Sequence, residues 1–127
     1  MKKIILLVLL SMGIFVSADI VKAAMGTREF IELCAKGKPN EVEAAIKNGA
    51  KINARLGEYG MTALIYAARG NPNPDVIALL LKNGADAQAR EKWDGKRAID
   101  YAGENGKLKN TAAFKQLQEA SKVTIKR

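Results

Sequence analysis

The stretch GMTALIYAARGNPNPDVIALLLKNGADAQAR, residues 60–90, decides the fold that this sequence predicts. It is typical of two short helices in succession, because Thr62 and Asn73 are good N-cap residues and Pro74 suits the first turn of a helix. The second of these helices carries a wide apolar surface, made by Val76, Ile77, Leu79, Leu80 and Leu81. One partner helix cannot cover so wide a surface, so the pattern predicts that this helix pair has neighbours on both sides.

An internal repeat indicates what those neighbours are. The segment KNGAKINARLGEYG (47–60) matches KNGADAQAREKWDG (82–95) at a constant offset of 35 residues. A period of this length is typical of stacked supersecondary units, each of which buries its apolar face only against its neighbours. We place three such units at residues 27–59, 60–94 and 95–121.

The predicted fold class is therefore all-α, an α-solenoid of three helix-turn-helix units joined by short β-hairpin loops. Five residues that tolerate the left-handed backbone conformation are expected to end the helices. They are Gly37, Asn71 and Gly106 after the first helices, and Gly49 and Gly84 after the second helices. The predicted core adds to the apolar residues above Phe30, Leu33, Cys34, Val42, Ala45, Ile46, Leu64, Ala67, Ala68, Ile99, Ala102, Ala113, Phe114 and Leu117.

The first residues have the pattern of a secretory signal peptide, which we place at residues 1–18. Lys2 and Lys3 precede a long apolar run, and small residues follow it, so cleavage is expected after Ala18 or as late as Ala23. An uncleaved anchor is the alternative, but a membrane-spanning helix needs roughly 20 apolar residues and this run is shorter.

Charge and export together narrow the expected partners. Cleavage of the signal peptide would remove Lys2 and Lys3 and lower the formal net charge from +8 to +6. In the mature chain, residues 19–26 would form a linker and residues 122–127 a tail. In an exported protein such a basic balance favours an anionic envelope surface, an acidic protein partner or simple solubility over nucleic acid. The terminal helix, from Thr111 to Ser121, has the polar outer surface expected of an uncovered last unit.

The residue inventory argues against catalysis and metal binding. The chain has no histidine and a single cysteine, so a catalytic triad, a thiol–imidazole pair and a zinc site of the usual ligands cannot form. We expect no enzyme activity, no cofactor and no metal. Cys34 falls on the apolar face of a predicted helix, where burial as a small hydrophobic residue is expected and a reactive thiol is the alternative.

Two motifs in the central unit resemble the ankyrin repeat. The family pattern Gly-x-Thr-Pro-Leu-His-x-Ala-Ala appears at residues 60–68, and Leu-Leu-x-x-Gly-Ala-Asp-x-Asn appears at residues 80–88. The resemblance covers residues 27–121. It departs from the family where Ala63 and Ile65 replace Pro and His, and the third unit has Arg97 in place of the capping Thr.

The resemblance implies a non-catalytic protein–protein interaction module that binds through its hairpin tips and the concave face of its first helices. Carried over by position, the predicted site residues are Arg55, Tyr59, Met61, Tyr66, Arg69, Arg90, Trp93 and Lys96. Tyr59 and Trp93 should lie at neighbouring tips, where aromatic side chains beside basic ones are typical of binding hot spots. The alternative is that both rings fold back and cover the hairpins.

These expectations lead to two hypotheses for the biological setting. The first is a monomeric protein of the bacterial envelope, most simply periplasmic, that binds an unidentified and acidic protein without nucleic acid or stable membrane insertion after cleavage. The second is an effector or antagonist secreted onward to act on a host or competitor cell. No secondary export signal in the sequence separates them.

Overall fold

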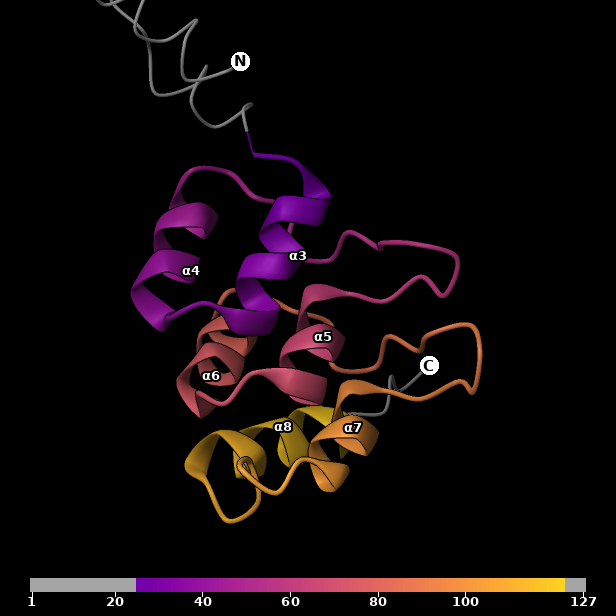
Figure 1. The fold of residues 1–127 in the computed structure, drawn as a ribbon. Helices are drawn as coiled ribbons and strands as arrows, with labels where there is room; N and C mark the ends of the chain where they lie inside the picture. The colour runs from indigo at the N-terminus through magenta and orange to yellow at the C-terminus, as the bar shows by residue number, and fades with distance from the viewer. Residues whose placement is uncertain (1–24, 123–127) are drawn as a thin grey trace, which may run out of the picture.

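The computed structural model describes residues 25–122, and within this range the chain forms six helices in three antiparallel pairs (Figure 1). Their bounds are α3 Thr27–Lys36, α4 Pro39–Lys47, α5 Ala63–Gly70, α6 Pro74–Lys82, α7 Ala98–Glu104 and α8 Ala112–Lys122. The pairs stack in chain order, so that α5 and α6 lie between the other two pairs. The predicted all-α repeat is confirmed. The proposed signal peptide and most of the tail lie outside the described residues.

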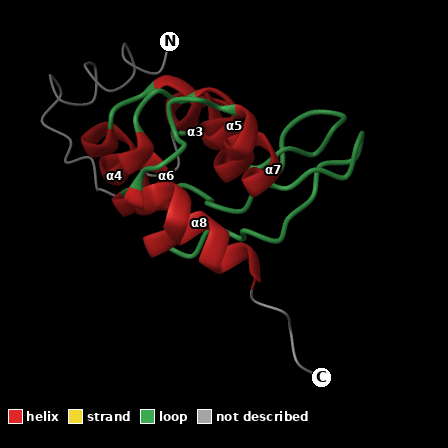
Figure 2. Cartoon of the chain, turned by 90° about the horizontal axis from the view of Figure 1, so that it is seen from below, coloured by secondary structure: helices red, strands yellow, loops and turns green. Residues whose placement is uncertain are grey.

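The six helices form two layers (Figure 2). The first helices of the pairs, α3, α5 and α7, pack side by side in one layer, and α4, α6 and α8 pack in the other. Two long loops, between α4 and α5 and between α6 and α7, project from the same side of the stack (Figure 1). This arrangement brings the two predicted hairpins next to each other.

N-cap side chains start α5, α6 and α8 where the sequence predicts them, at Thr62, Asn73 and Thr111. The Thr62 hydroxyl accepts a hydrogen bond from the Ile65 amide (3.3 Å), and the Asn73 side chain accepts one from the Asp75 amide (3.0 Å). Each bond satisfies an amide that has no partner within the helix. Arg97 cannot cap α7 in this way, and the Asp100 carboxylate instead accepts a hydrogen bond from the Arg97 amide (2.8 Å). A reversed cap therefore compensates for the missing threonine.

The core follows the inward faces of the stacked helices, with the densest burial in the middle pair. Val76, Ile77 and Leu80 of α6 are at most 1% exposed, whereas Leu79 and Leu81 are half-buried against the core. The predicted core residues Leu33, Ile46, Ile99 and Phe114 are also only half-buried. Three large apolar residues that are fully buried were not predicted to be in the core: Ile31 in α3, Ile65 in α5 and Leu108 in the α7–α8 loop.

The prediction of left-handed ends for the first helices is wrong. The residues that follow α3, α5 and α7 are Gly37, Asn71 and Asn105, with φ of −79°, −73° and −84°. They are extended because the chain must pass directly into the next segment, and the third equivalent position is Asn105 rather than Gly106. For the second helices the prediction is confirmed, since Gly49 and Gly84 have φ of 92° and 90°.

Asparagine side chains tie the ends of α5 and α7 to the previous unit. The Asn71 amide nitrogen donates to the backbone oxygens of Cys34 (2.7 Å) and Gly37 (3.2 Å). Asn105 donates in the same way to the Ala68 oxygen (3.2 Å). Because these carbonyls lie at helix ends, where they lack intrahelical partners, the asparagines both satisfy them and set the spacing between units.

The projecting loops are hairpins in shape but contain almost no β structure. Within residues 25–122 there is no β-strand, and an isolated antiparallel bridge joins Leu56 to Met61. In the second loop the Glu91 amide donates to the Lys96 oxygen (3.0 Å). Backbone pairing this short needs side chains to hold the loops together, and these side chains build the candidate site.

Candidate functional site

Two arginines at equivalent positions hold the hairpins closed. The Arg55 guanidinium donates to the Gly60 oxygen and the Arg90 guanidinium donates to the Gly95 oxygen, both at 2.8 Å. Arg55 also donates to the Arg90 oxygen (2.8 Å) and so connects the two loops. Part of the hydrogen-bonding capacity of both predicted binding residues is therefore used within the protein.

The two hairpin tips meet through their aromatic side chains. The ring centroids of Tyr59 and Trp93 lie 4.9 Å apart, with the planes inclined at 35°. The backbones of the two tips are also joined, because the Lys92 amide donates a hydrogen bond to the backbone carbonyl oxygen of Tyr59 (2.8 Å). Trp93 is nevertheless 70% exposed and Tyr59 is 45% exposed. The structure thus differs from the alternative in which the rings fold back and cover the hairpins. It presents them as an exposed aromatic pair.

A buried carboxylate shapes the second tip. Glu91 is only 3% exposed, and its carboxylate accepts hydrogen bonds from the backbone amides of Trp93, Asp94 (2.9 Å) and Lys96 (3.0 Å). The hydrogen bond from the Lys96 amide is the largest cause that holds the pKa of Glu91 below its ordinary value. Three bonds to one carboxylate fix the loop that carries Trp93.

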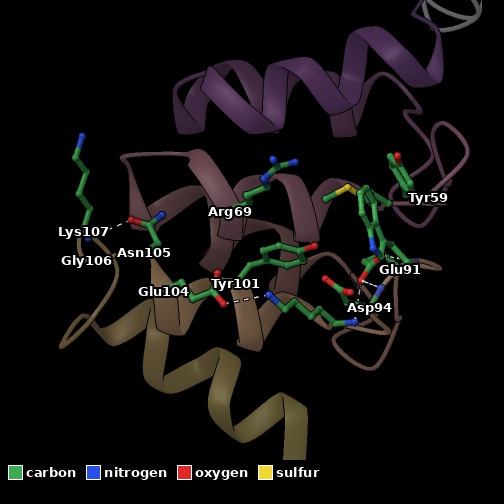
Figure 3. A pocket seen from close by; sticks show the side chains of 12 residues that line it. Tyr59, Arg69, Glu91, Asp94, Tyr101, Glu104, Asn105, Gly106 and Lys107 are labelled. Carbon is green, nitrogen blue, oxygen red and sulfur yellow. Dashed lines mark hydrogen bonds and ion pairs between the residues drawn. The ribbon is translucent and has the colours of Figure 1, made fainter.

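A groove of about 680 Å³ runs between this aromatic pair and the first-helix layer. Tyr59 lies at one end and Asn105 and Lys107 lie at the other, with Tyr101 and Arg69 between them (Figure 3). The rest of the lining comes from Met61, Glu91, Trp93, Asp94, Lys96, Glu104 and Gly106. Helices α5 and α7 therefore supply the floor, and the hairpins supply one wall.

An ion pair crosses the floor of the groove. The Lys96 ammonium lies 3.2 Å from a Glu104 carboxylate oxygen and 5.3 Å from the centre of the Tyr101 ring, within the range of a cation–π contact. Its hydrogen bond to Glu104 raises the pKa of Lys96, and desolvation raises the pKa of Tyr101. At neutral pH the lysine is charged and the tyrosine is neutral.

Five of the eight predicted site residues line this groove: Tyr59, Met61, Arg69, Trp93 and Lys96. Tyr66 is half-buried against the core and lies outside the lining, as do Arg55 and Arg90 in the hairpins. Only part of the predicted surface is thus brought together around one hollow.

The expectation that Met61 is exposed at a tip is wrong. Its backbone pairs with Leu56, and its side chain joins the core and is 4% exposed, although it reaches the groove wall. Sequence reasoning also missed Tyr101 and Glu91. Tyr101 stands 35 residues after Tyr66, so the repeat register could have found it. Glu91 stands 35 residues after Leu56, and nothing in the repeat indicates a carboxylate there.

Cys34 is fully buried in α3, and desolvation raises the pKa of its thiol to about 12. The thiol is therefore protonated and shielded, which argues against a nucleophilic role. Among residues 25–122, no group of three or more His, Cys, Asp or Glu side chains is placed to hold a metal ion.

Comparison with known proteins agrees with the three-unit fold. The family model of three ankyrin repeats matches residues 30–126. This chain belongs to the ankyrin repeat family. The chain is also similar to an ankyrin repeat protein of fowlpox virus (strain NVSL), with 49% identity over 49 residues, which is 39% of this chain and 9% of the viral protein.

Membership in the family carries a general functional meaning. Ankyrin repeats are generally protein–protein interaction modules, typically without catalytic activity of their own. The chain spans about a tenth of the length of the viral relative, so the likeness extends to the repeats and not to a whole protein. Of the helices in the described part of the chain, none has the length and apolar character required to cross a membrane.

Proposed function

We propose that this ankyrin repeat protein is a non-catalytic binding module that holds a protein partner in the groove between its hairpin tips and its first-helix layer. The observation that carries the proposal is the exposed aromatic pair of Tyr59 and Trp93. Large aromatic side chains dominate the energetics of protein interfaces, and exposing one to water is unfavourable unless a partner covers it.

The groove supplies what an interface needs around such an anchor. Polar and charged side chains rim it, among them Arg69 and Lys107, and hydrogen bonds within the hairpins hold the aromatic pair in place. A preorganised surface loses little conformational entropy on binding, which increases affinity.

The test is affinity capture of the tagged protein from its native cells after chemical cross-linking, with Trp93→Ala compared against Met25→Ala. Met25 is the matched control because it is also a large apolar side chain, 37% exposed, and it lies outside the groove lining. We expect the wild type and the control to capture the same partner and Trp93→Ala to lose most of it. Equal capture by both variants would mean that the groove is not the binding surface.

For the setting, we propose export to the bacterial envelope, most simply to the periplasm. The support is the amino-terminal pattern of two lysines, an apolar run and small residues. Cell fractionation with mass spectrometry of the amino terminus tests this, and the expected product is a periplasmic chain that begins at Asp19 or Ala24. A protein found in the culture medium would favour the secreted effector, and one that keeps Met1 in the cytoplasm would refute export.

A further inference from the structure

The charges around the groove are unevenly satisfied. Two of its three carboxylates already have partners within the protein. Glu91 accepts hydrogen bonds from three backbone amides, and Glu104 forms an ion pair with Lys96. Asp94 forms no ion pair within 4 Å among the described residues. Among the described residues, Asp94 is therefore the one carboxylate of the groove that is exposed and has no ion-pair partner.

Most of the cationic side chains on the same surface, unlike most of the carboxylates, have no charged partner among the described residues. Arg69 and Lys107 line the groove, are exposed, and form no ion pair with any residue in the range 25–122. Within residues 25–122, Arg55 and Arg90 on the adjoining hairpins donate to backbone carbonyls and form no ion pair. The surface thus carries a surplus of positive charge that a partner can neutralise.

Apolar and cationic features lie at different places along the groove. Tyr59 marks the end with the aromatic pair, whereas Arg69 lies over the middle beside Tyr101 and Lys107 lies at the far end (Figure 3). A basic segment placed here would meet Arg69 and Lys107, and apart from Asp94 it would find an exposed carboxylate only by displacing Lys96 from Glu104. An acidic segment meets neither obstacle, and Asp94, the carboxylate that would repel it, lies toward the aromatic end of the groove (Figure 3).

We propose that the groove takes an acidic segment of the partner, with a large apolar side chain against Tyr59 and Trp93 and a carboxylate on Arg69. This inference rests on the proposed function and adds the chemistry of the partner to it. An arginine suits the role, because its planar guanidinium binds a carboxylate through two parallel hydrogen bonds.

The experiment is selection of a random heptapeptide library displayed on phage against the purified protein, followed by fluorescence anisotropy with labelled synthetic copies of the selected peptides. The variants are Arg69→Glu, Trp93→Ala and Lys115→Glu. Lys115→Glu is the matched control because it changes the net charge equally, at an exposed position of α8 outside the groove lining. Circular dichroism melting checks that each variant is folded.

We expect wild-type peptides to be enriched in Asp or Glu together with a large apolar residue. Arg69→Glu should weaken their binding at least about fivefold, about 1 kcal/mol, and should select basic residues in place of acidic ones. Lys115→Glu should leave affinity within about twofold, and added salt should weaken wild-type binding more than Arg69→Glu binding.

Other outcomes overturn the inference and separate it from the proposed function. If Trp93→Ala abolishes binding while Arg69→Glu does not, the groove binds peptides but the acidic class is wrong. If the library yields no binder, or binders without acidic enrichment, the inference fails while Trp93-dependent capture in cells still supports the proposed function. If neither groove variant changes peptide binding or capture, both fail.

Discussion

At the scale of single residues, the exposure of Trp93 is explained by the loop that carries it. An indole ring that is 70% exposed gains little from burial, and its contact with Tyr59 is one tilted ring pair. The position of the ring depends on the Glu91 carboxylate, which accepts hydrogen bonds from three backbone amides of the loop. A buried acid thus organises the exposed aromatic residue of the site.

This dependence gives a prediction for pH. Because the pKa of Glu91 is lowered in the folded protein, its stabilising effect is present above the ordinary glutamate value of about 4.3 and is lost as pH falls through the folded pKa. Fluorescence of Trp93, which is the only tryptophan in the chain, should therefore change on acidification below about pH 4.3.

The matched variant is Glu91→Gln, which keeps the size of the side chain and removes its charge. At pH 7 its tryptophan emission should already resemble that of the acidified wild type, and its pH response should be flat. Tryptophan emission should be measured from pH 7 down to the pH at which the whole protein begins to unfold, and far-ultraviolet circular dichroism identifies that pH. A change in emission above that pH then reports on the loop and not on global unfolding. An unchanged response in Glu91→Gln would refute the role assigned to this carboxylate.

Residue positions within the hairpins were the part that sequence could not predict. The repeat register places Arg55 and Arg90 at equivalent positions of the two hairpins. It does not indicate that each guanidinium group donates a hydrogen bond to the backbone carbonyl of the residue five positions further along the same hairpin. Likewise, Met61 follows Gly60 at a turn and has the pattern of an exposed residue, yet backbone pairing with Leu56 turns it inward. Such choices depend on three-dimensional contacts between loops.

At the scale of elements, asparagine bridges join consecutive first helices. Asn71 is fully buried and binds two backbone oxygens at the end of α3, whereas Asn105 is half-buried and binds one at the end of α5. The sequence pattern predicts a helix end at Asn71, but through the backbone conformation of this residue. The side-chain amide is the functional part, which helix-end statistics do not reveal.

We predict that Asn71→Ala lowers the free energy of unfolding by about 1–3 kcal/mol, because it leaves two carbonyls at the end of α3 with one partner fewer each. Asn105→Ala should cost less, since it removes one longer bond at a half-buried position. The control is Asn40→Ala on the exposed surface of α4, which should lie within about 0.5 kcal/mol of the wild type. Urea unfolding checks the order, and an equal cost for Asn71 and Asn40 would contradict it.

At the scale of the whole molecule, three helix pairs are a small array in which the middle pair has the largest share of the core. The 35-residue repeat and the apolar excess of Pro74–Lys82 were enough to predict this stack, because periodic burial is the strongest signal that a sequence carries. The groove was predicted only in outline, since its floor needs α7 and its wall needs a folded hairpin.

We predict that Leu80→Ala, at a position that is 0% exposed, costs about 2–5 kcal/mol and leaves the protein largely unfolded or much less heat-stable. Leu79→Ala, one position earlier and half-buried, should cost clearly less. Thermal melting followed by circular dichroism checks both. An unchanged melting temperature for Leu80→Ala would contradict the packing of the middle pair.

If the partner covers the groove, the lysine side chains in and beside the groove must face the partner, and a cross-linker can detect this. Lys92, Lys96 and Lys107 lie in or beside the groove, whereas Lys47 and Lys82 end helices α4 and α6 in the other layer. An amine-reactive cross-linker applied to the complex, with the cross-linked peptides identified by mass spectrometry, reports which group faces the partner. We expect links from Lys92, Lys96 or Lys107, whereas links confined to Lys47 and Lys82 would mean that the partner binds elsewhere.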